Sequence, residues 1–377
     1  MNIHNIVLKI FVIIYYFIFE VKFSEGKLQE ICNNKLFSYF NDENLLIKNE
    51  CLIKEKLEYC THCIQNQNEK NCINCPALEI LDELNILSPN ATLDQIIYKK
   101  KSLARFADGE FDLIFHRNIS FQKYNKSISN RLREILVSEE KDLLIGVNND
   151  LNKSFLDNLN SNTKKFWNTY VSRNQFNLIN VLNLNKTYAS AKISRFYLDY
   201  KNKSDVKYYI NKLKMIWDNK DIVIIEGDKS RLGIGNDLFD NAKSIQRILG
   251  PAENAYNVYD KLYEESLKVN KNKLILIALG PTATVLAYDL YKSGYQVIDI
   301  GHVDIEYEWY LRNVTKKVKI EYKYVNEIKR GKRNIKDITD KKYFEQIISV
   351  IKRKAKKTKK EKIRNKRRIK RRIIKKK

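Results

Sequence analysis

The sequence predicts an α/β fold in which a mostly parallel sheet has helices on both faces. Short, continuous apolar runs such as DIVIIEG at 221–227 and KLILIALG at 273–280 are typical of strands buried on both sides. Segments with helical spacing of apolar residues separate these runs, and this alternation favours parallel strands joined by helical crossovers. Polar or glycine-rich residues follow several runs, at the strand ends where such sheets bind ligands.

The expected elements alternate along the chain. Helices are expected over 77–87, 92–101, 127–137, 162–176, 204–217, 256–267 and 282–292. Strands are expected over 102–107, 142–147, 188–193, 221–227, 273–280 and 296–301. We interpret Phe166 and Trp167 as core residues of their helix. After Tyr324 the pattern gives way to charged residues, apart from one candidate helix near 343–351.

The net charge of +25 is unevenly distributed over the 377 residues. Residues 351–377 hold eighteen Lys or Arg and one Glu, which is +17 and leaves +8 for the rest of the chain. The folded part is therefore only mildly basic, and no specific nucleic-acid partner is expected. The whole stretch 326–377 is predicted to be a basic, disordered tail, because it has too few large apolar residues to form a core.

The N-terminus resembles a secretory signal. Lys9 precedes an apolar run over 10–19, and Ser24 and Gly26 supply small residues at the spacing of a cleavage site. We interpret residues 1–26 as a cleaved signal peptide ahead of two alternatives, an uncleaved anchor over 6–23 and a buried helix of a cytosolic protein. The protein is expected in the lumen of the secretory pathway or outside the cell. If the signal is not cleaved, the N-terminus would anchor it to the membrane.

All six cysteines lie in one 44-residue window, within a predicted Cys-rich module over 27–90. They are Cys32, Cys51, Cys60, Cys63, Cys72 and Cys75. An even number of clustered cysteines after a signal peptide favours disulfides. Two Cys-x-x-Cys pairs, with His62 inside one of them, also have the spacing of a zinc site, so that alternative stays open.

Two carboxylates separated by one glycine follow the strand expected over 102–107. Asp108 and Glu110 would both reach the carboxyl end of that strand, and Gly109 allows a tight turn between them. Paired oxygen ligands suit a hard cation such as Mg²⁺ or Mn²⁺ that keeps other positions for water and phosphate. The alternative is an ordinary helix start, with one acid as the N-cap and the other facing the helix dipole.

Two further strand ends are suited to phosphate. The strand over 221–227 runs into a loop that contains Gly227, Ser230, Arg231, Gly233 and Asn236, which could surround phosphate oxygens with backbone N–H groups and a guanidinium. The loop is neither a Walker loop nor a Gly-x-Gly-x-x-Gly motif, and the alternative is a glycine-rich turn. The strand over 273–280 ends in Gly280, Pro281 and Thr282, where a helix start would favour an anion.

An imidazole and several carboxylates follow the strand over 296–301. His302 is a candidate metal ligand, and Asp304 and Glu308 are candidate general bases. The alternative is that the acids are solvated and the histidine is a satisfied core residue.

Four segments together resemble the GT-D-type glycosyltransferases. They read RFADGEF at 105–111, EGDKSRLGIGNDLFDNAKSIQRIL at 226–249, LGPTATVLAYDL at 279–290 and IDIGHVDIEYEWY at 298–310. The resemblance spans roughly 93–312 in the family's order, although Ala107 stands where many members have glycine. It implies a Rossmann-like domain, here over 91–325, that uses Mn²⁺ or Mg²⁺ and a nucleotide-sugar donor, typically a UDP-sugar.

The resemblance implies roles for the residues already singled out. Asp108 and Glu110 occupy the family's Asp-x-Glu motif, and Arg105 in the same segment is expected to contact the donor. The acceptor would be a glycan or a glycoprotein. Two other functions compete: a non-catalytic nucleotide- or glycan-binding protein of the same fold, and a protein that binds polyanions or an anionic membrane through the tail. A dinucleotide oxidoreductase is disfavoured because the glycine fingerprint is missing.

Overall fold

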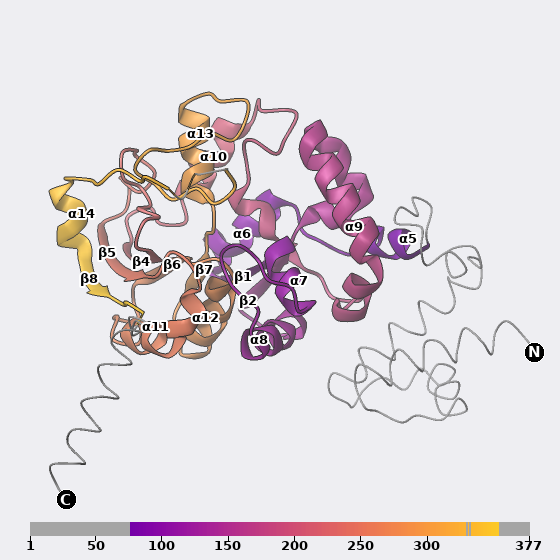
Figure 1. Ribbon diagram of the computed structural model, residues 1–377, viewed down its shortest axis with the longest axis horizontal. Coiled ribbons are helices and arrows are strands. Elements are labelled where there is room, and N and C mark those ends of the chain that lie inside the picture. Colours follow the sequence, from indigo (N-terminus) through magenta and orange to yellow (C-terminus); the bar gives the residue numbers. More distant parts are fainter. Residues whose placement is uncertain (1–75, 329–330, 332, 354–377) are drawn as a thin grey trace, which may run out of the picture.

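Eight parallel strands form one sheet in the computed structural model, which describes residues 76–328, 331 and 333–353 (Figure 1). The strands are β1 (Ser102–Phe106), β2 (Leu143–Val147), β3 (Ala189–Ser190), β4 (Asp221–Gly227), β5 (Ser244–Gly250), β6 (Leu274–Ala278), β7 (Val297–Asp299) and β8 (Ile347–Val350). Their order across the sheet is β3-β2-β1-β7-β6-β4-β5-β8. The predicted parallel α/β fold is confirmed.

Helices cover both faces of the sheet. They are α5 (Pro76–Asp82), α6 (Pro89–Lys99), α7 (Asp108–Ile114), α8 (Lys126–Val137), α9 (Ser161–Val181), α10 (Val206–Lys214), α11 (Tyr259–Ser266), α12 (Pro281–Lys292), α13 (Val303–Leu311) and α14 (Lys341–Gln346). Figure 1 shows α8, α11 and α12 together on one side, and their apolar residues form one core with that face. Apolar residues of α6, α10 and α13 form a second core on the opposite face.

Strand β4 shows why the apolar runs are continuous. Val223 and Ile225 belong to one core, whereas Ile222 and Ile224 belong to the other, and all four are fully buried. Successive side chains of a strand point to opposite faces, so a strand that is covered on both sides needs apolar residues at every position.

The centre of the sheet is the place where the chain reverses its direction of travel. From β1 the chain moves outward through β2 to β3, whereas β7 is reached from β6 on the other side. The segments after β1 and β7 then enter helices that belong to different cores, α7 in the first and α13 in the second. Sheets of this type have a crevice at this position, beyond the carboxyl ends of the strands.

One expected strand is shorter in the structure, and one strand was not expected. The strand expected over 188–193 joins the sheet at Ala189–Ser190 and then becomes a 3-10 helix over Ala191–Ser194. The turn draws Lys192 into a buried ion pair with Asp150 (2.9 Å) and Asp199 (3.1 Å), which an extended strand would not form. Strand β5 was not predicted, because polar residues fill its first half.

The folded domain begins before residue 91. Helix α5 lies within the range assigned to the Cys-rich module, yet Ile80, Leu81 and Leu84 are buried in the same core as α9. The signal peptide over 1–26, all six cysteines and the tail beyond Arg353 lie outside the described residues. Among the residues that the structure describes, no helix has the length and apolar character to cross a membrane.

The domain also continues beyond residue 325. The single helix expected near 343–351 is instead the short helix α14 followed by strand β8, which pairs in parallel with β5. The Ile351 N–H donates to the Leu249 carbonyl (2.7 Å), and Gln346 accepts a hydrogen bond from buried Arg247 (2.7 Å). The start of the basic tail at 326 was therefore placed too early, because a short, mostly apolar segment among charges, IISVI at 347–351, does not distinguish a helix from a strand.

Ending the chain after Asp340 should lower the melting temperature by about 5 °C or more relative to a chain that ends after Arg353. The shorter chain lacks α14 and β8, so it exposes the edge of β5 and deprives Arg247 of Gln346. Differential scanning calorimetry of the two truncated chains measures the difference. Equal melting temperatures would show that β8 contributes nothing to the stability of the sheet.

Candidate active site

A cavity of about 600 Å³ lies over the carboxyl ends of the central strands. Its lining includes Asp108 after β1, Asn148 after β2, Ser230 after β4, Gly280 after β6 and His302 after β7. Helix α9 and the segment over 324–327 complete the walls. The volume is in the range of small-molecule and cofactor sites, and the position is the crevice that this strand order creates.

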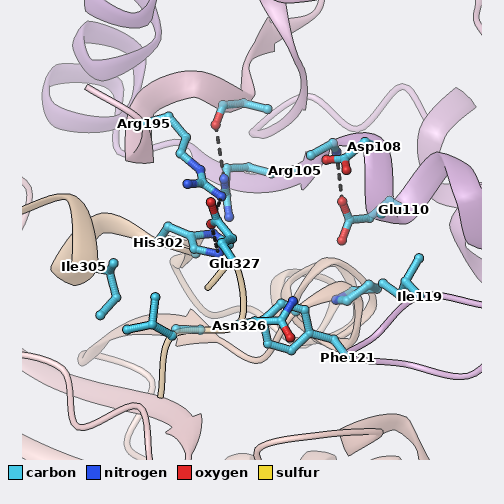
Figure 2. Close-up of a pocket in the computed structure, with 18 of the residues that line it drawn as sticks. Arg105, Asp108, Glu110, Ile119, Phe121, Arg195, His302, Ile305, Asn326 and Glu327 are labelled. Carbon is cyan, nitrogen blue, oxygen red and sulfur yellow. Dashed lines mark hydrogen bonds and ion pairs between the residues drawn. The ribbon is translucent and has the colours of Figure 1, made fainter. Parts of the chain in front are cut away.

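Asp108 and Glu110 lie together on one side of this cavity, at the start of α7 (Figure 2). One oxygen of Glu110 accepts a hydrogen bond from the Ala107 N–H (2.8 Å), so this side chain does cap the helix. Burial raises the pKa of Glu110 to about 8, and the nearby Asp299 and Asp108 add to the shift. Burial also raises the pKa of Asp108, although Arg195 opposes this shift. Half-buried acids with raised pKa values in a cleft indicate a functional site.

The carboxylate pair fits a hard divalent cation. Both side chains supply oxygen donors and both line the cavity, and a cation between them would favour the ionised form of both acids. His302 does not join them: no group of three or more His, Cys, Asp or Glu side chains placed to hold a metal occurs in the part of the chain that the structure describes. The donor set therefore suits an ion that completes its coordination with water and phosphate.

Arg105 is used mainly as a bridge under the cavity. Its guanidinium donates to the Asp299 carbonyl and carboxylate (2.8 Å each), to the Ala191 carbonyl (3.1 Å) and to the Ser194 hydroxyl (2.8 Å). These bonds tie β1 to β7 and to the turn after β3. Arg105 also lines the cavity, but most of its N–H groups already have acceptors, and its contact with the donor stays a prediction.

Glu327 is the centre of a charged cluster on the opposite side of the cavity. Arg195 and Lys317 form ion pairs with its carboxylate, and His302 Nε2 lies 3.0 Å from it. Figure 2 shows Arg195, His302 and Glu327 grouped together. Burial disfavours the ionised carboxylate, but Arg195 and then His302 outweigh it and hold the pKa of Glu327 far below its usual range. Burial and Arg195 lower the pKa of His302.

Asp304 and Glu308 do not act as free bases in this structure. The Lys323 amino group donates to both Asp304 oxygens (2.9 and 2.7 Å) and to Glu308 (2.9 Å), and all three side chains are buried. Asn236 donates to both acids as well. Both acids therefore serve as counter-charges of Lys323 in this structure, and their role as general bases stays a prediction. Asp304 lines the cavity, whereas Glu308 does not.

The loop after β4 supports the fold more than it forms a phosphate cradle. Arg231 donates to the carbonyls of Tyr322 (2.8 Å) and Lys336 (2.6 Å), and the Gly233 N–H donates to Asp304 (2.7 Å). Among the five residues predicted for this role, Ser230 lines the cavity, whereas Gly227, Arg231, Gly233 and Asn236 do not. Gly233 has a φ of +76°, and a Cβ there would lie 2.7 Å from the Phe239 ring, so the turn itself requires glycine.

The start of α12 remains a candidate anion site. Gly280 and Pro281 line the cavity, whereas Thr282 is buried behind them. The first N–H groups of a helix and its dipole favour negative charge at this end. The rings of Phe121 and Tyr324, with centroids 5.7 Å apart, lie at the same end of the cavity.

Proteins similar to this chain are glycosyltransferases, the class that this fold and this cavity suit. The family model described as the glycosyltransferase GT-D fold matches residues 103–328, and the chain belongs to that family. The predicted resemblance is thus confirmed. The matched region extends past the expected boundary at 325 and includes Lys323 and Glu327, which sequence reasoning did not single out.

Two curated relatives come from streptococci. The probable glycosyl transferase Gly of Streptococcus gordonii is 39% identical over 247 residues, which cover 65% of this chain and 36% of that protein. The glycosyltransferase GlyD of Streptococcus pneumoniae serotype 4 is 37% identical over 273 residues, which cover 72% of this chain and 33% of that protein. The chain therefore spans about a third of the length of these relatives.

Solved structures agree with the family assignment. A domain formerly of unknown function, DUF1792, reported to have a distinct glycosyltransferase fold, is 38% identical with a TM-score of 0.70, covering 73% of this chain and 99% of that one. A DUF1792 glycosyltransferase from Streptococcus sanguinis is 37% identical with a TM-score of 0.68, covering 71% of this chain and all of that one.

Replacing Lys323 with alanine should lower the free energy of unfolding by about 3 kcal/mol or more, because two buried acids lose their counter-charge. Replacing the exposed Lys316 should change it by less than about 0.5 kcal/mol. Urea unfolding of both variants at pH 7 measures the difference. Equal effects of the two substitutions would show that the buried ion cluster does not stabilise the fold.

The effect of Lys323 should depend on pH. Although burial disfavours its ionised form, Glu308 has a pKa held below the ordinary 4.5 by Lys323 and the other hydrogen-bond donors. The stabilisation is therefore complete above pH 4.5 and is lost as the pH falls through the folded-state value. The difference in melting temperature between the wild type and Lys323→Ala should be largest near pH 7 and should shrink in acid. A constant difference down to pH 4 would contradict an electrostatic origin.

Proposed function

We propose that the chain is a metal-dependent glycosyltransferase that transfers a hexose from a nucleotide sugar, a UDP-sugar, to a hydroxyl of a glycan or glycoprotein. The observation that carries the proposal is the half-buried pair Asp108 and Glu110, with raised pKa values, in the cavity at the centre of the sheet. The family supports sugar transfer. The identity of the donor, the metal and the acceptor goes beyond the family assignment and is our proposal.

Two parts of the cavity would bind different parts of the donor: one the metal ion and the other the phosphate oxygens. Asp108 and Glu110 would hold Mn²⁺ or Mg²⁺, which neutralises charge on a diphosphate leaving group. Gly280 and Pro281 would place the first N–H groups of α12 towards the phosphate oxygens. Arg195 and Lys317 add positive charge near the same space, although Glu327 partly neutralises them.

The acceptor hydroxyl is itself the nucleophile, so the main task of the protein is to stabilise the charge that develops on the leaving group. The bond between the anomeric carbon and the phosphate oxygen breaks, the acceptor oxygen bonds to that carbon, and the acceptor hydroxyl loses its proton. The diphosphate gains negative charge in the transition state, so groups that are fixed near it accelerate the reaction. The start of helix α7 and the hydrogen bond from the Ala107 N–H to Glu110 position the carboxylate pair before any substrate enters.

The location and the terminal segments are part of the same proposal. The signal-like N-terminus and the clustered cysteines support a lumenal or secreted enzyme with disulfides, anchored by its N-terminus if the signal is not cleaved. The basic tail would hold the enzyme near an anionic membrane or an acidic glycan.

Asp108→Asn should lower kcat for UDP-sugar turnover by at least about 100-fold, which is about 2.7 kcal/mol of activation free energy. The substitution removes a charge but little volume, so the melting temperature should change little. Asp260→Asn is the matched control, since Asp260 lies in the first turn of α11 and is exposed. Turnover is measured with a panel of UDP-sugars in Mn²⁺ and in EDTA. Full activity of Asp108→Asn, or of the wild type in EDTA, would contradict the metal-binding role and leave Asp108 as an ordinary first-turn acid of α7.

Mass spectrometry of the natively produced protein should show a chain that starts after residue 26, with cysteines that react with an alkylating agent only after reduction. Oxidation follows from an oxidising compartment, where paired thiols form disulfides. Six reactive thiols together with one or more bound zinc ions would contradict the disulfide interpretation and favour the metal alternative.

A further inference from the structure

Helix α9 presents aromatic and polar side chains to one end of the cavity. Asn162, Thr163, Phe166 and Trp167 all line it, at the spacing of one helix face. Phe166 is 48% exposed, whereas Trp167 is 4% exposed. The core role expected for Phe166 is therefore wrong, while that for Trp167 is confirmed. An exposed aromatic ring at a cavity indicates a binding surface more strongly than an exposed ring elsewhere.

The Phe166 ring rests on a fixed aromatic base. Its centroid lies 5.4 Å from the Trp167 ring at 85° and 6.1 Å from the Tyr170 ring at 23°. Trp167 and Tyr170 also contact each other edge to face, at 5.4 Å. Because these rings already fix Phe166, a ligand that packs on its open face loses little side-chain entropy.

This aromatic cluster is connected to the carboxylate pair. The Tyr170 hydroxyl donates to the backbone carbonyl of Asp108 (3.1 Å). A ring packed on Phe166 would therefore lie beside the metal-binding side of the cavity. The start of α12, which suits the donor phosphates, contributes a different part of the lining.

The chemistry around Phe166 suits a sugar. One face of a pyranose carries C–H groups that pack on the electron-rich face of an aromatic ring, while its hydroxyls need polar partners at the rim. Asn162 supplies an amide, and Asp199, which accepts a hydrogen bond from Thr163 (3.4 Å), supplies a carboxylate. A lipid or an apolar peptide would offer the Asn162 amide no hydrogen-bond partner.

We propose that Phe166 and the adjacent face of α9 form the acceptor subsite, which binds a pyranose ring of the glycan acceptor. The inference rests on the proposed function, since it names the second substrate of the same cavity. With the acceptor ring on Phe166, a hydroxyl would point towards the anomeric carbon of a donor held by Asp108 and Glu110.

The experiment compares Phe166→Ala with Phe176→Ala. Phe176 is on the same helix and is 40% exposed, but it does not line the cavity. The probes are the methyl glycosides of glucose, galactose and N-acetylglucosamine, which carry no aromatic group of their own. Saturation-transfer NMR in the presence of UDP and Mn²⁺ detects their binding, and calorimetry measures the affinity for UDP. Phe166→Leu and Phe166→Trp separate aromatic stacking from apolar packing.

We expect at least one glycoside to bind the wild type, with a 10-fold or greater loss in Phe166→Ala and Phe166→Leu. Phe166→Trp and Phe176→Ala should keep binding, and UDP affinity should stay within 2-fold in every variant. No bound glycoside in the wild type, or undiminished binding in Phe166→Ala, would overturn the subsite. A loss of UDP affinity in Phe166→Ala would also overturn it and would assign the ring to the donor. Absence of UDP-sugar turnover by the wild type would instead count against the proposed function.

Discussion

The buried amino group of Lys323 holds the site together, because it attaches the segment after α13 to the fold. Lys323 is fully buried against Asp304 and Glu308, and the residues that follow it bring Tyr324 and Glu327 to the cavity. A buried cation of this kind is favourable only when its counter-charges are already in place. The first two turns of α13 supply both acids, so the helix after β7 determines where the wall of the cavity forms.

The carboxyl groups in the cavity have different pKa values because their neighbouring charges differ. Asp108 and Glu110 face each other with raised pKa values, whereas Glu327 is surrounded by cations and has a strongly lowered one. Burial acts on all three in the same direction, and the neighbouring charges decide the outcome. The carboxylate pair is thus short of positive charge, which a cation would supply, while Glu327 already has enough.

The sequence predicted most of the sheet and the position of the carboxylate pair, because both follow from local pattern. Continuous apolar runs predicted most strands, and a polar pair at a strand end predicted one side of the cavity. Strand β5 was missed because Arg247 is buried through contacts with Glu226, Tyr343 and Gln346, which are distant in sequence. The ion pairs of Asp304 and Glu308 were missed for the same kind of reason, since their partner Lys323 lies 19 and 15 residues further along the chain.

Most of the site is built from contacts between the two halves of the chain, and this has a consequence for folding. Strand β1 pairs with β2 at short range, but its other neighbour is β7, where the Val297 N–H donates to the Ser102 hydroxyl across 195 residues. Closing so long a loop is slow, and it yields contacts only when both halves are present. The crevice lies at this joint, so a chain in synthesis carries both carboxylates long before the opposite wall of the cavity exists. The cavity is complete only when β7 lies beside β1 and the segment over 324–327 is in place.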